Sequence, residues 1–193
     1  MFNKKSLTYN KLMKFFTFVL IFFSLFAFSL SAYNLYNVFT HPLKYKTEII
    51  NYANENNLNP ALIASVINVE SSFNENAKSN KNAIGLMQVK LTTANYINTL
   101  TNTEKIDETD LYVPTKNIKI GTLYLRYLID KFENINTALA SYNAGETRVR
   151  SWLNSGIYSL DGKTLNYIPF EETRNYVEKV NKNMKFYEKL FKI

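Results

Sequence analysis

Two kinds of apolar pattern divide the 193 residues of the chain. Residues 15–33 contain no charged side chain, and only Thr and Ser interrupt their apolar run. A helix of this length spans about 28 Å, close to the hydrocarbon thickness of a bilayer. From residue 44 onward, apolar residues instead recur at spacings of three and four, the period of amphipathic helices. The pattern predicts one membrane-crossing helix followed by a mainly helical domain.

The residues that flank the apolar run predict its orientation. Four lysines lie within residues 1–14 without an acid to offset them, and the positive-inside rule keeps such a segment in the cytoplasm. The expected parts are a basic cytoplasmic tail over 1–14, a single-pass anchor in the cell membrane over 15–33, a linker over 34–43 and an extracytoplasmic domain over 44–193. The run is longer than the usual core of a signal peptide, which favours an uncleaved anchor. A cleaved signal peptide is the alternative, and it would make the domain a secreted protein.

Start and stop signals for helices recur through the domain. An amphipathic stretch over 45–57 comes first, and Asn59 and Pro60 then provide an N-cap and a first-turn proline. The helix that follows is apolar on nearly every side, which is typical of the centre of a domain. The remaining regular segments expected are helices after Pro114, over 135–142 and after Pro169, and a short pair of strands within 83–91. The predicted fold class is mainly α with at most a small β-hairpin.

Composition limits the chemistry that the domain can perform. The chain has no cysteine and a single histidine, His41, which falls in the expected linker. Disulfide scaffolds, cysteine metal sites and Cys–His pairs are thereby excluded, and Ser–His–Asp chemistry nearly so. Carboxylates, hydroxyls, amides and amines are left to do the chemistry.

The distribution of charge argues against a nucleic-acid partner. The formal net charge is +7, but four of the lysines lie before the apolar run, and Lys and Glu are interspersed along the rest of the chain. A nucleic-acid footprint would need Lys and Arg clustered on one face. A weak attraction to anionic polymers of the cell surface fits the charge equally well.

Glu70 is the residue that first suggests catalysis. It follows the mostly apolar segment 60–69, near the expected C-terminal end of a buried helix. Apolar surroundings and the partial negative charge of a helix C-terminus both disfavour a carboxylate, so the pKa of Glu70 should rise. A carboxyl group still protonated near neutral pH can protonate a poor alkoxide leaving group. The alternative is an ordinary carboxylate at the polar end of a helix, pointing to water.

Three ordered motifs favour the catalytic interpretation. Residues 70–89 read ESSFNENAKSNKNAIGLMQV, residues 138–149 read ALASYNAGETRV, and residues 168–180 read IPFEETRNYVEKV. Together they resemble the signature blocks of the soluble-lytic-transglycosylase (SLT) domain family. Any one block alone would be weak, but three in the same order make coincidence a poor explanation. The resemblance implies a lysozyme-like, largely helical fold.

The resemblance also implies an activity, that of a peptidoglycan lytic transglycosylase. Such enzymes cleave the β-1,4 bond between N-acetylmuramic acid and N-acetylglucosamine. Glu70 would act as the catalytic acid on the glycosidic oxygen and then as a base that takes the proton of the muramic acid 6-hydroxyl, leaving a 1,6-anhydro end. The other matching positions are Tyr176 and Ser79 as supporting residues, and Gln88, Met87, Tyr142 and Asn143 as substrate-binding residues.

The implied mechanism needs only one carboxyl group, whereas hydrolytic glycosidases generally use two. Glu171 and Glu172 are explained by the start of a helix, where the macrodipole favours acids. The acids within 103–110 lie in a polar segment that is typical of a solvated loop. No second acid is marked by its context, which suits the one-carboxylate reaction. The resemblance also implies no metal and no cofactor, because the acid and the substrate's own hydroxyl suffice.

Two alternatives stay open at this point. A goose-type-like lysozyme would hydrolyse the same bond, and a non-catalytic peptidoglycan-binding module would only hold the glycan. The expected partners are peptidoglycan glycan strands, the membrane through the N-terminal helix, and a wall-crossing or wall-remodelling machinery.

Overall fold

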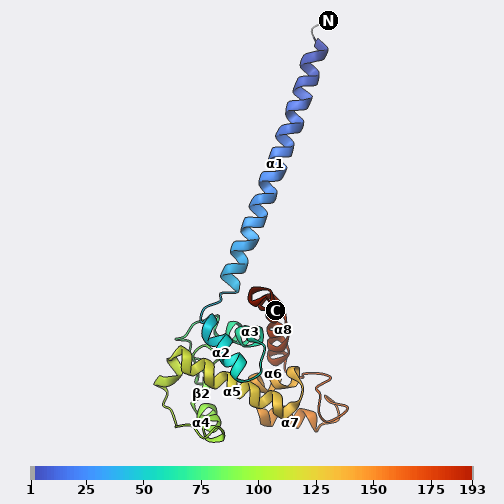
Figure 1. Ribbon diagram of the computed structural model, residues 1–193. Helices are drawn as coiled ribbons and strands as arrows, with labels where there is room; N and C mark the ends of the chain where they lie inside the picture. Colours follow the sequence, from blue (N-terminus) through green and yellow to red (C-terminus); the bar gives the residue numbers. More distant parts are fainter. Residues whose placement is uncertain (1–2, 193) are drawn as a thin grey trace. The chain divides into compact units, whose positions relative to one another are not determined.

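The chain folds into two compact units, and the boundary between them in the sequence falls after Pro42. The computed structural model describes the backbone of residues 3–192, and the side chains from residue 11 onward except those of Asn34 and Val38. Figure 1 labels the helices α1 to α8 and the strand β2 along the chain.

The first unit is formed by one helix, α1 (Asn3–Thr40), drawn in blue in Figure 1. Its stretch Lys11–Asn37 is long and apolar enough to cross a membrane, by length and composition. The hydroxyls of Thr17 and Ser24 donate to backbone carbonyls three or four residues earlier, at 2.9 and 2.8 Å. Bonds of this kind satisfy the polar groups of an otherwise apolar span.

Helix α1 continues beyond the end that the sequence predicts. A linker is expected over 34–43, but residues 34–40 are helical. No glycine or proline occurs between residue 15 and Pro42, so no residue of that segment breaks the ladder of backbone hydrogen bonds. The non-helical connection is therefore shorter than predicted.

The second unit begins at Leu43 and is mainly helical. Its helices are α2 (Lys46–Glu55), α3 (Pro60–Ser71), α4 (Leu91–Leu100), the 3₁₀-helix η1 (Thr109–Tyr112), α5 (Pro114–Phe132), α6 (Ile135–Ala144), α7 (Glu146–Leu153) and α8 (Glu171–Phe191). The strands β1 (Ala83–Ile84) and β2 (Val89–Lys90) pair antiparallel, with Ala83 opposite Lys90. The predicted class, mainly α with a small hairpin, is confirmed.

Helix α4 lies in a segment for which the sequence predicts no helix. Its sequence, LTTANYINTL, is rich in Thr and Asn, which are weak helix formers. Ala94, Ile97 and Asn98 are nevertheless buried, so tertiary packing against the neighbouring helix α5 compensates for the weak local preference.

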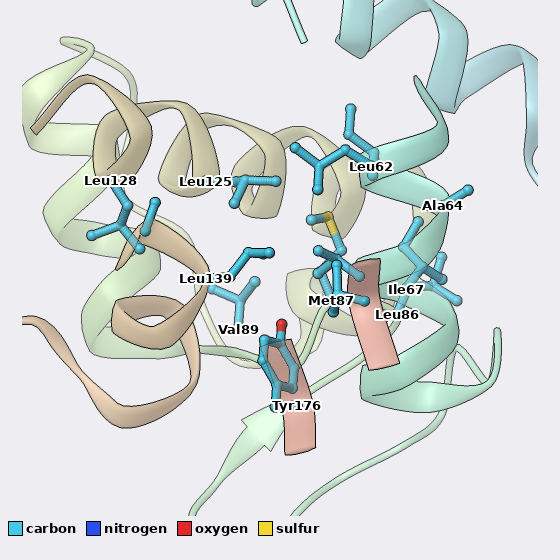
Figure 2. Packing of buried hydrophobic residues seen from close by; sticks show 14 of the residues in the cluster. Leu62, Ala64, Ile67, Leu86, Met87, Val89, Leu125, Leu128, Leu139 and Tyr176 are labelled. Carbon is cyan, nitrogen blue, oxygen red and sulfur yellow. The ribbon is translucent and has the colours of Figure 1, made fainter. Parts of the chain in front are cut away.

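Helix α3 forms the centre of the second unit. Every residue from Ala61 to Asn68 is buried, and the helix packs against α2 and α8. Figure 2 shows Ile67 of α3 and Leu125 of α5 in one cluster with side chains of the hairpin and of α6. The side chain of Asn59 accepts a hydrogen bond from the backbone N–H of Ala61 at 2.8 Å, which confirms the predicted N-cap.

A buried amide of α5 holds the turn between the two strands. Asn117 donates from Nδ2 to the carbonyls of Ile84, at 2.9 Å, and Leu111, at 2.7 Å. Its Oδ1 accepts from the backbone N–H of Met87 at 2.8 Å. Gly85 passes beside this amide with a φ of 75°. A Cβ at Gly85 would lie 2.3 Å from Nδ2 of Asn117 and 2.4 Å from the carbonyl oxygen of Leu111, so only glycine fits.

We expect Gly85→Ala to lower the free energy of unfolding by about 3 kcal/mol, because left-handed strain adds to an overlap with a backbone atom. Gly162→Ala is the matched control, since Gly162 has a φ of 70° but no atom within 4 Å of where its Cβ would stand. That change should cost only about 1 kcal/mol. Urea unfolding of the full chain measures both, and equal losses would contradict the close approach at Gly85.

Candidate active site

One pocket of about 460 Å³ brings together five of the seven site residues that the sequence predicts. A pocket of this size suits a small ligand or one sugar unit of a longer chain. Its walls come from the end of α3, the hairpin, α4, α5, the junction of α6 with α7, and the start of α8. The five residues are Glu70, Ser79, Gln88, Tyr142 and Asn143.

The end of α3 delivers Glu70 to this pocket. The helix ends at Ser71, and the next two residues, Ser72 and Phe73, take left-handed φ values of 51° and 61°. The hydroxyl of Ser71 donates to the carbonyl of Leu86 at 2.8 Å, which ties the helix end to the hairpin turn. The chain thus reverses direction directly after Glu70, and the carboxyl group reaches the pocket at the edge of the core.

The carboxyl group of Glu70 titrates near neutral pH. Burial, the largest effect, raises its pKa to about 7, because a charge is poorly stabilised away from water. The hydroxyl of Tyr176 lowers this pKa by hydrogen bonding, and the negative charge of Glu172 raises it. The direction of the shift is the one that the sequence predicts.

Tyr176 lies behind Glu70 on α8 and does not line the pocket. Its ring enters the core cluster shown in Figure 2, and only 6% of the residue is exposed. Burial raises the pKa of its hydroxyl well above the usual range, so the group stays a proton donor. The hydroxyl is buried close enough to Glu70 to lower the pKa of that residue, yet among the described residues no partner stands at full hydrogen-bond geometry.

Ser79 and Gln88 shape the hairpin side of the pocket and keep polar atoms free for a ligand. Oγ of Ser79 accepts from the backbone N–H groups of Ala83, at 3.0 Å, and Lys81, at 3.3 Å, which leaves its proton available to donate. Nε2 of Gln88 donates to the carbonyls of Ala77, at 3.1 Å, and Gly85, at 2.9 Å. The amide oxygen of Gln88 is therefore left as an acceptor.

Asn143 and Tyr142 come from the last turn of α6. The hydroxyl of Thr173 donates to Oδ1 of Asn143 at 2.8 Å, which orients the amide and leaves its NH₂ group to donate. The hydroxyl of Tyr142 donates to the carbonyl of Met87 at 2.8 Å. The ring of Tyr142 thus serves as a wall, with its polar end already bonded.

Met87 does not contact the pocket, and the substrate-binding role expected for its side chain is not supported. The side chain is fully buried and lies where a Cβ on Gly121 would come within 2.5 Å of its sulfur. The backbone of Met87 instead helps to hold the hairpin turn, because its N–H donates to Asn117 and its carbonyl accepts from Tyr142.

Glu172 is a pocket residue that the sequence analysis missed. It lies in the first turn of α8, as predicted, but it also lines the pocket and raises the pKa of Glu70. A spacing of four residues places Glu172 and Tyr176 on the same face of α8. That spacing is the signal that could have linked Glu172 to the site.

Three cations on the rim of the pocket were also missed. Lys81 and Lys90 lie on the hairpin side, and Arg148 lies on α7. The guanidinium of Arg148 sits 5.1 Å from the ring centre of Phe170 and donates to the carbonyl of Ala144 at 3.1 Å. The rim is therefore positive around an acidic centre, which favours an anionic polymer as ligand.

The part of the chain that forms the pocket resembles known proteins. The family model of the transglycosylase SLT domain matches residues 47–162, more than half of the chain. The mainly helical arrangement with its small hairpin is the lysozyme-like SLT fold, as two solved structures demonstrate. An inactive mutant of the lytic transglycosylase Slt from Pseudomonas aeruginosa superimposes with a TM-score of 0.70 at 29% identity, covering 79% of this chain and 25% of that chain. The 70 kDa soluble lytic transglycosylase of Escherichia coli gives a TM-score of 0.69 at 30% identity, covering 78% and 25%.

Curated relatives agree with the family model. The soluble lytic murein transglycosylase of Salmonella typhimurium is 34% identical over 142 residues, which cover 72% of this chain and 22% of that protein. The membrane-bound lytic murein transglycosylase E of Buchnera aphidicola is 44% identical over 87 residues, which cover 43% of this chain and 38% of that protein. The chain therefore belongs to the transglycosylase SLT domain family, although it spans only about a fifth of the Salmonella relative.

The raised pKa of Glu70 links protein stability to pH. Between the ordinary value of 4.5 and about 7, the folded protein binds this proton more tightly than the unfolded chain does. Stability is therefore lost as the pH rises through this window. We expect Glu70→Gln, which removes the titrating group, to gain stability over the parent as the pH rises, by up to about 3 kcal/mol.

Guanidinium unfolding at pH values below, within and above the window measures this difference. Glu178→Gln, at an exposed carboxyl group on α8, is the control and should show no such trend. A stability difference for Glu70→Gln that does not vary with pH would show that the carboxyl group titrates normally.

Proposed function

We propose that this chain is a lytic transglycosylase that cleaves the glycan strands of peptidoglycan. One observation carries the proposal: a carboxyl group with a pKa of about 7 faces a pocket lined by hydroxyl and amide groups. Membership of the SLT domain family supports it, because relatives named as lytic murein transglycosylases match the same part of the chain. Since those relatives are several times longer, the activity is argued from the site of this chain.

In the first step, the protonated Glu70 donates its proton to the oxygen that joins N-acetylmuramic acid to N-acetylglucosamine. A pKa of about 7 keeps a large share of the group protonated at neutral pH. The bond between this oxygen and C1 of the muramic acid breaks, and the N-acetylglucosamine side leaves as an alcohol. Positive charge develops at C1, and the Glu70 carboxylate formed in this step faces it.

In the second step, the same carboxylate acts as a base. The 6-hydroxyl oxygen of the muramic acid attacks C1, and its proton returns to Glu70. The new bond closes a 1,6-anhydro ring, so no water is consumed and Glu70 recovers its starting state. The hydroxyl of Tyr176 would stabilise the carboxylate between the two steps, because a hydrogen bond to the charged form lowers the pKa.

The polar residues of the pocket would hold the sugars. Within the described part of the chain, Ser79 keeps a free hydroxyl proton, Gln88 a free amide oxygen and Asn143 a free amide NH₂. Donors and acceptors of this kind match the hydroxyl and N-acetyl groups of peptidoglycan sugars. The ring of Tyr142 would provide an apolar wall beside them.

A second candidate function is hydrolysis, as in a goose-type-like lysozyme, and Glu172 is the observation that favours it. This carboxyl group lines the same pocket as Glu70, and a hydrolase needs a second carboxylate to activate water or stabilise the sugar cation. Glu172 is exposed and interacts with Glu70 through charge. Hydrolysis would leave reducing ends in place of anhydro ends.

We further infer that α1 holds the enzyme at the cell membrane. Its stretch Lys11–Asn37 has the length and apolar character of a membrane span, and the lysines before residue 15 favour a cytoplasmic N-terminus. The domain would then act outside the cytoplasm, near wall-remodelling or wall-crossing machinery. Cleavage of α1 as a signal peptide would instead release the domain as a secreted enzyme. Membrane extraction and N-terminal sequencing of the mature protein separate these two cases.

We expect Glu70→Gln to reduce cleavage of purified peptidoglycan by at least about 10²-fold, because the amide cannot donate the proton. The measurement is mass spectrometry of the released muropeptides, with circular dichroism to show that the variant is folded. The parent should release 1,6-anhydro ends, and finding only reducing ends would establish the hydrolase instead. Full cleavage by Glu70→Gln would contradict a catalytic role for this residue, and a parent that binds but does not cleave would be a non-catalytic module.

Tyr176→Phe tests the hydrogen bond to Glu70. Its loss should raise the pKa of Glu70, because the hydroxyl lowers that pKa in the parent. The activity of the parent should fall as the pH rises above about 7, and this limb should move to higher pH in Tyr176→Phe, with a lower maximal rate. The control is Tyr187→Phe, at a buried tyrosine of the same helix whose hydroxyl accepts from Asn68 at 3.0 Å. Identical pH profiles for Tyr176→Phe and the parent would exclude this role.

A further inference from the structure

Four tyrosines form a continuous row that starts in the pocket and ends on the surface. The ring centres of Tyr142 and Tyr124 are 5.2 Å apart, those of Tyr124 and Tyr127 are 6.4 Å apart, and those of Tyr127 and Tyr96 are 5.8 Å apart. We call these four residues the tyrosine row. It draws its members from α6, α5 and α4.

The row leads away from the pocket in one direction. Tyr142 and Tyr124 line the pocket, as does Thr93 on α4. Tyr127 follows Tyr124 by three residues on α5, and Tyr96 follows Thr93 by three residues on α4. Because residues three apart lie on the same helix face, both outer tyrosines stand one turn beyond a pocket-lining residue. Two separate helices thus extend the pocket wall toward the same place.

Packing alone does not explain the outer end of the row. Helix α4 buries Ala94, Ile97 and Asn98 against the core, whereas Tyr96 is 47% exposed. Its ring makes an edge-to-face contact with that of Tyr127, at an inter-ring angle of 79°. Much of an aromatic ring is thus open to solvent next to a binding pocket.

Polar groups border the outer rings. The hydroxyls of Tyr96 and Tyr127 lie 3.1 Å apart, and Tyr127 also donates to Glu146 at 3.1 Å. Lys131 bonds both the Tyr127 hydroxyl and the Glu146 carboxylate. The ammonium group of Lys131 also lies over the ring of Tyr127, 4.8 Å from its centre, so the open ring is that of Tyr96. An exposed ring with hydroxyl, carboxylate and ammonium groups nearby matches a pyranose ring, which has apolar C–H faces and a polar rim.

We propose that the outer end of the tyrosine row, the exposed ring of Tyr96 beside Tyr127, binds further sugar residues of the glycan strand whose cleavage point lies at Glu70. This inference rests on the proposed function, since it extends the same site. It assigns Tyr96 as a residue that sets the preference for long strands over short ones. The ligand class is a β-1,4-linked chain of N-acetylated hexosamines that passes from the pocket onto the faces of α5 and α4.

The test is binding of N-acetylglucosamine oligomers of increasing length to the full chain carrying Glu70→Gln, which binds without turnover. Calorimetry in detergent should show affinity rising with length until the row is covered. We expect Tyr96→Ala in this background to weaken the binding of the longest oligomers about three- to tenfold, and to leave that of the shortest unchanged. Tyr96→Phe should keep most of the affinity, because the ring face is retained.

Tyr167→Ala is the matched control. Tyr167 is 52% exposed, and its ring centre lies 6.3 Å from that of Tyr158 at an inter-ring angle of 34°, but it does not line the pocket. Its removal should leave the affinity for every length unchanged. An equal effect of Tyr96→Ala on short and long oligomers, or no effect on either, would overturn the proposal while leaving the pocket assignment intact. If no oligomer of any length bound, the proposed function itself would fail, and this inference would fail with it.

Discussion

A carboxyl group at the end of a fully buried helix is the constraint around which the second unit is arranged. Helix α3 is buried from Ala61 to Asn68, and Glu70, two residues further on, lines the pocket. Burial disfavours its charged form, the negative charge of Glu172 adds to that effect, and the Tyr176 hydroxyl opposes both. The balance leaves a pKa near neutrality, where one group can both give and accept a proton.

The hairpin turn is held to the helices by a small set of hydrogen bonds, and these position the other half of the site. The side chain of Asn117 on α5 accepts from the backbone N–H of Met87. The hydroxyl of Ser71, at the end of α3, donates to the carbonyl of Leu86, and that of Tyr142 on α6 donates to the carbonyl of Met87. Each bond satisfies a backbone group that would otherwise be buried without a partner. The same contacts therefore stabilise the fold and set Gln88 and Ser79 opposite Glu70.

Much of this protein could be predicted from local patterns. The apolar run of α1, the N-cap at Asn59, the buried character of α3 and the small hairpin each depend on residues close together in the chain. The rise in the pKa of Glu70 follows for the same reason, because an acid placed after an all-round apolar helix has few other environments available. The ordered motifs likewise named five residues that the structure brings into one pocket.

Only the tertiary structure decided how distant segments meet. Met87 lies between Gly85 and Gln88, which both have positive φ values, and its side chain, expected in the cleft, is fully buried. The packing of α8 on α3 places Glu172 beside a carboxyl group about a hundred residues earlier in the chain, and the junction of α4, α5 and α6 assembles the tyrosine row. Sequence periodicity determines which face of a helix is apolar, but it does not determine which partner covers that face, because the partner is selected by packing across the whole core.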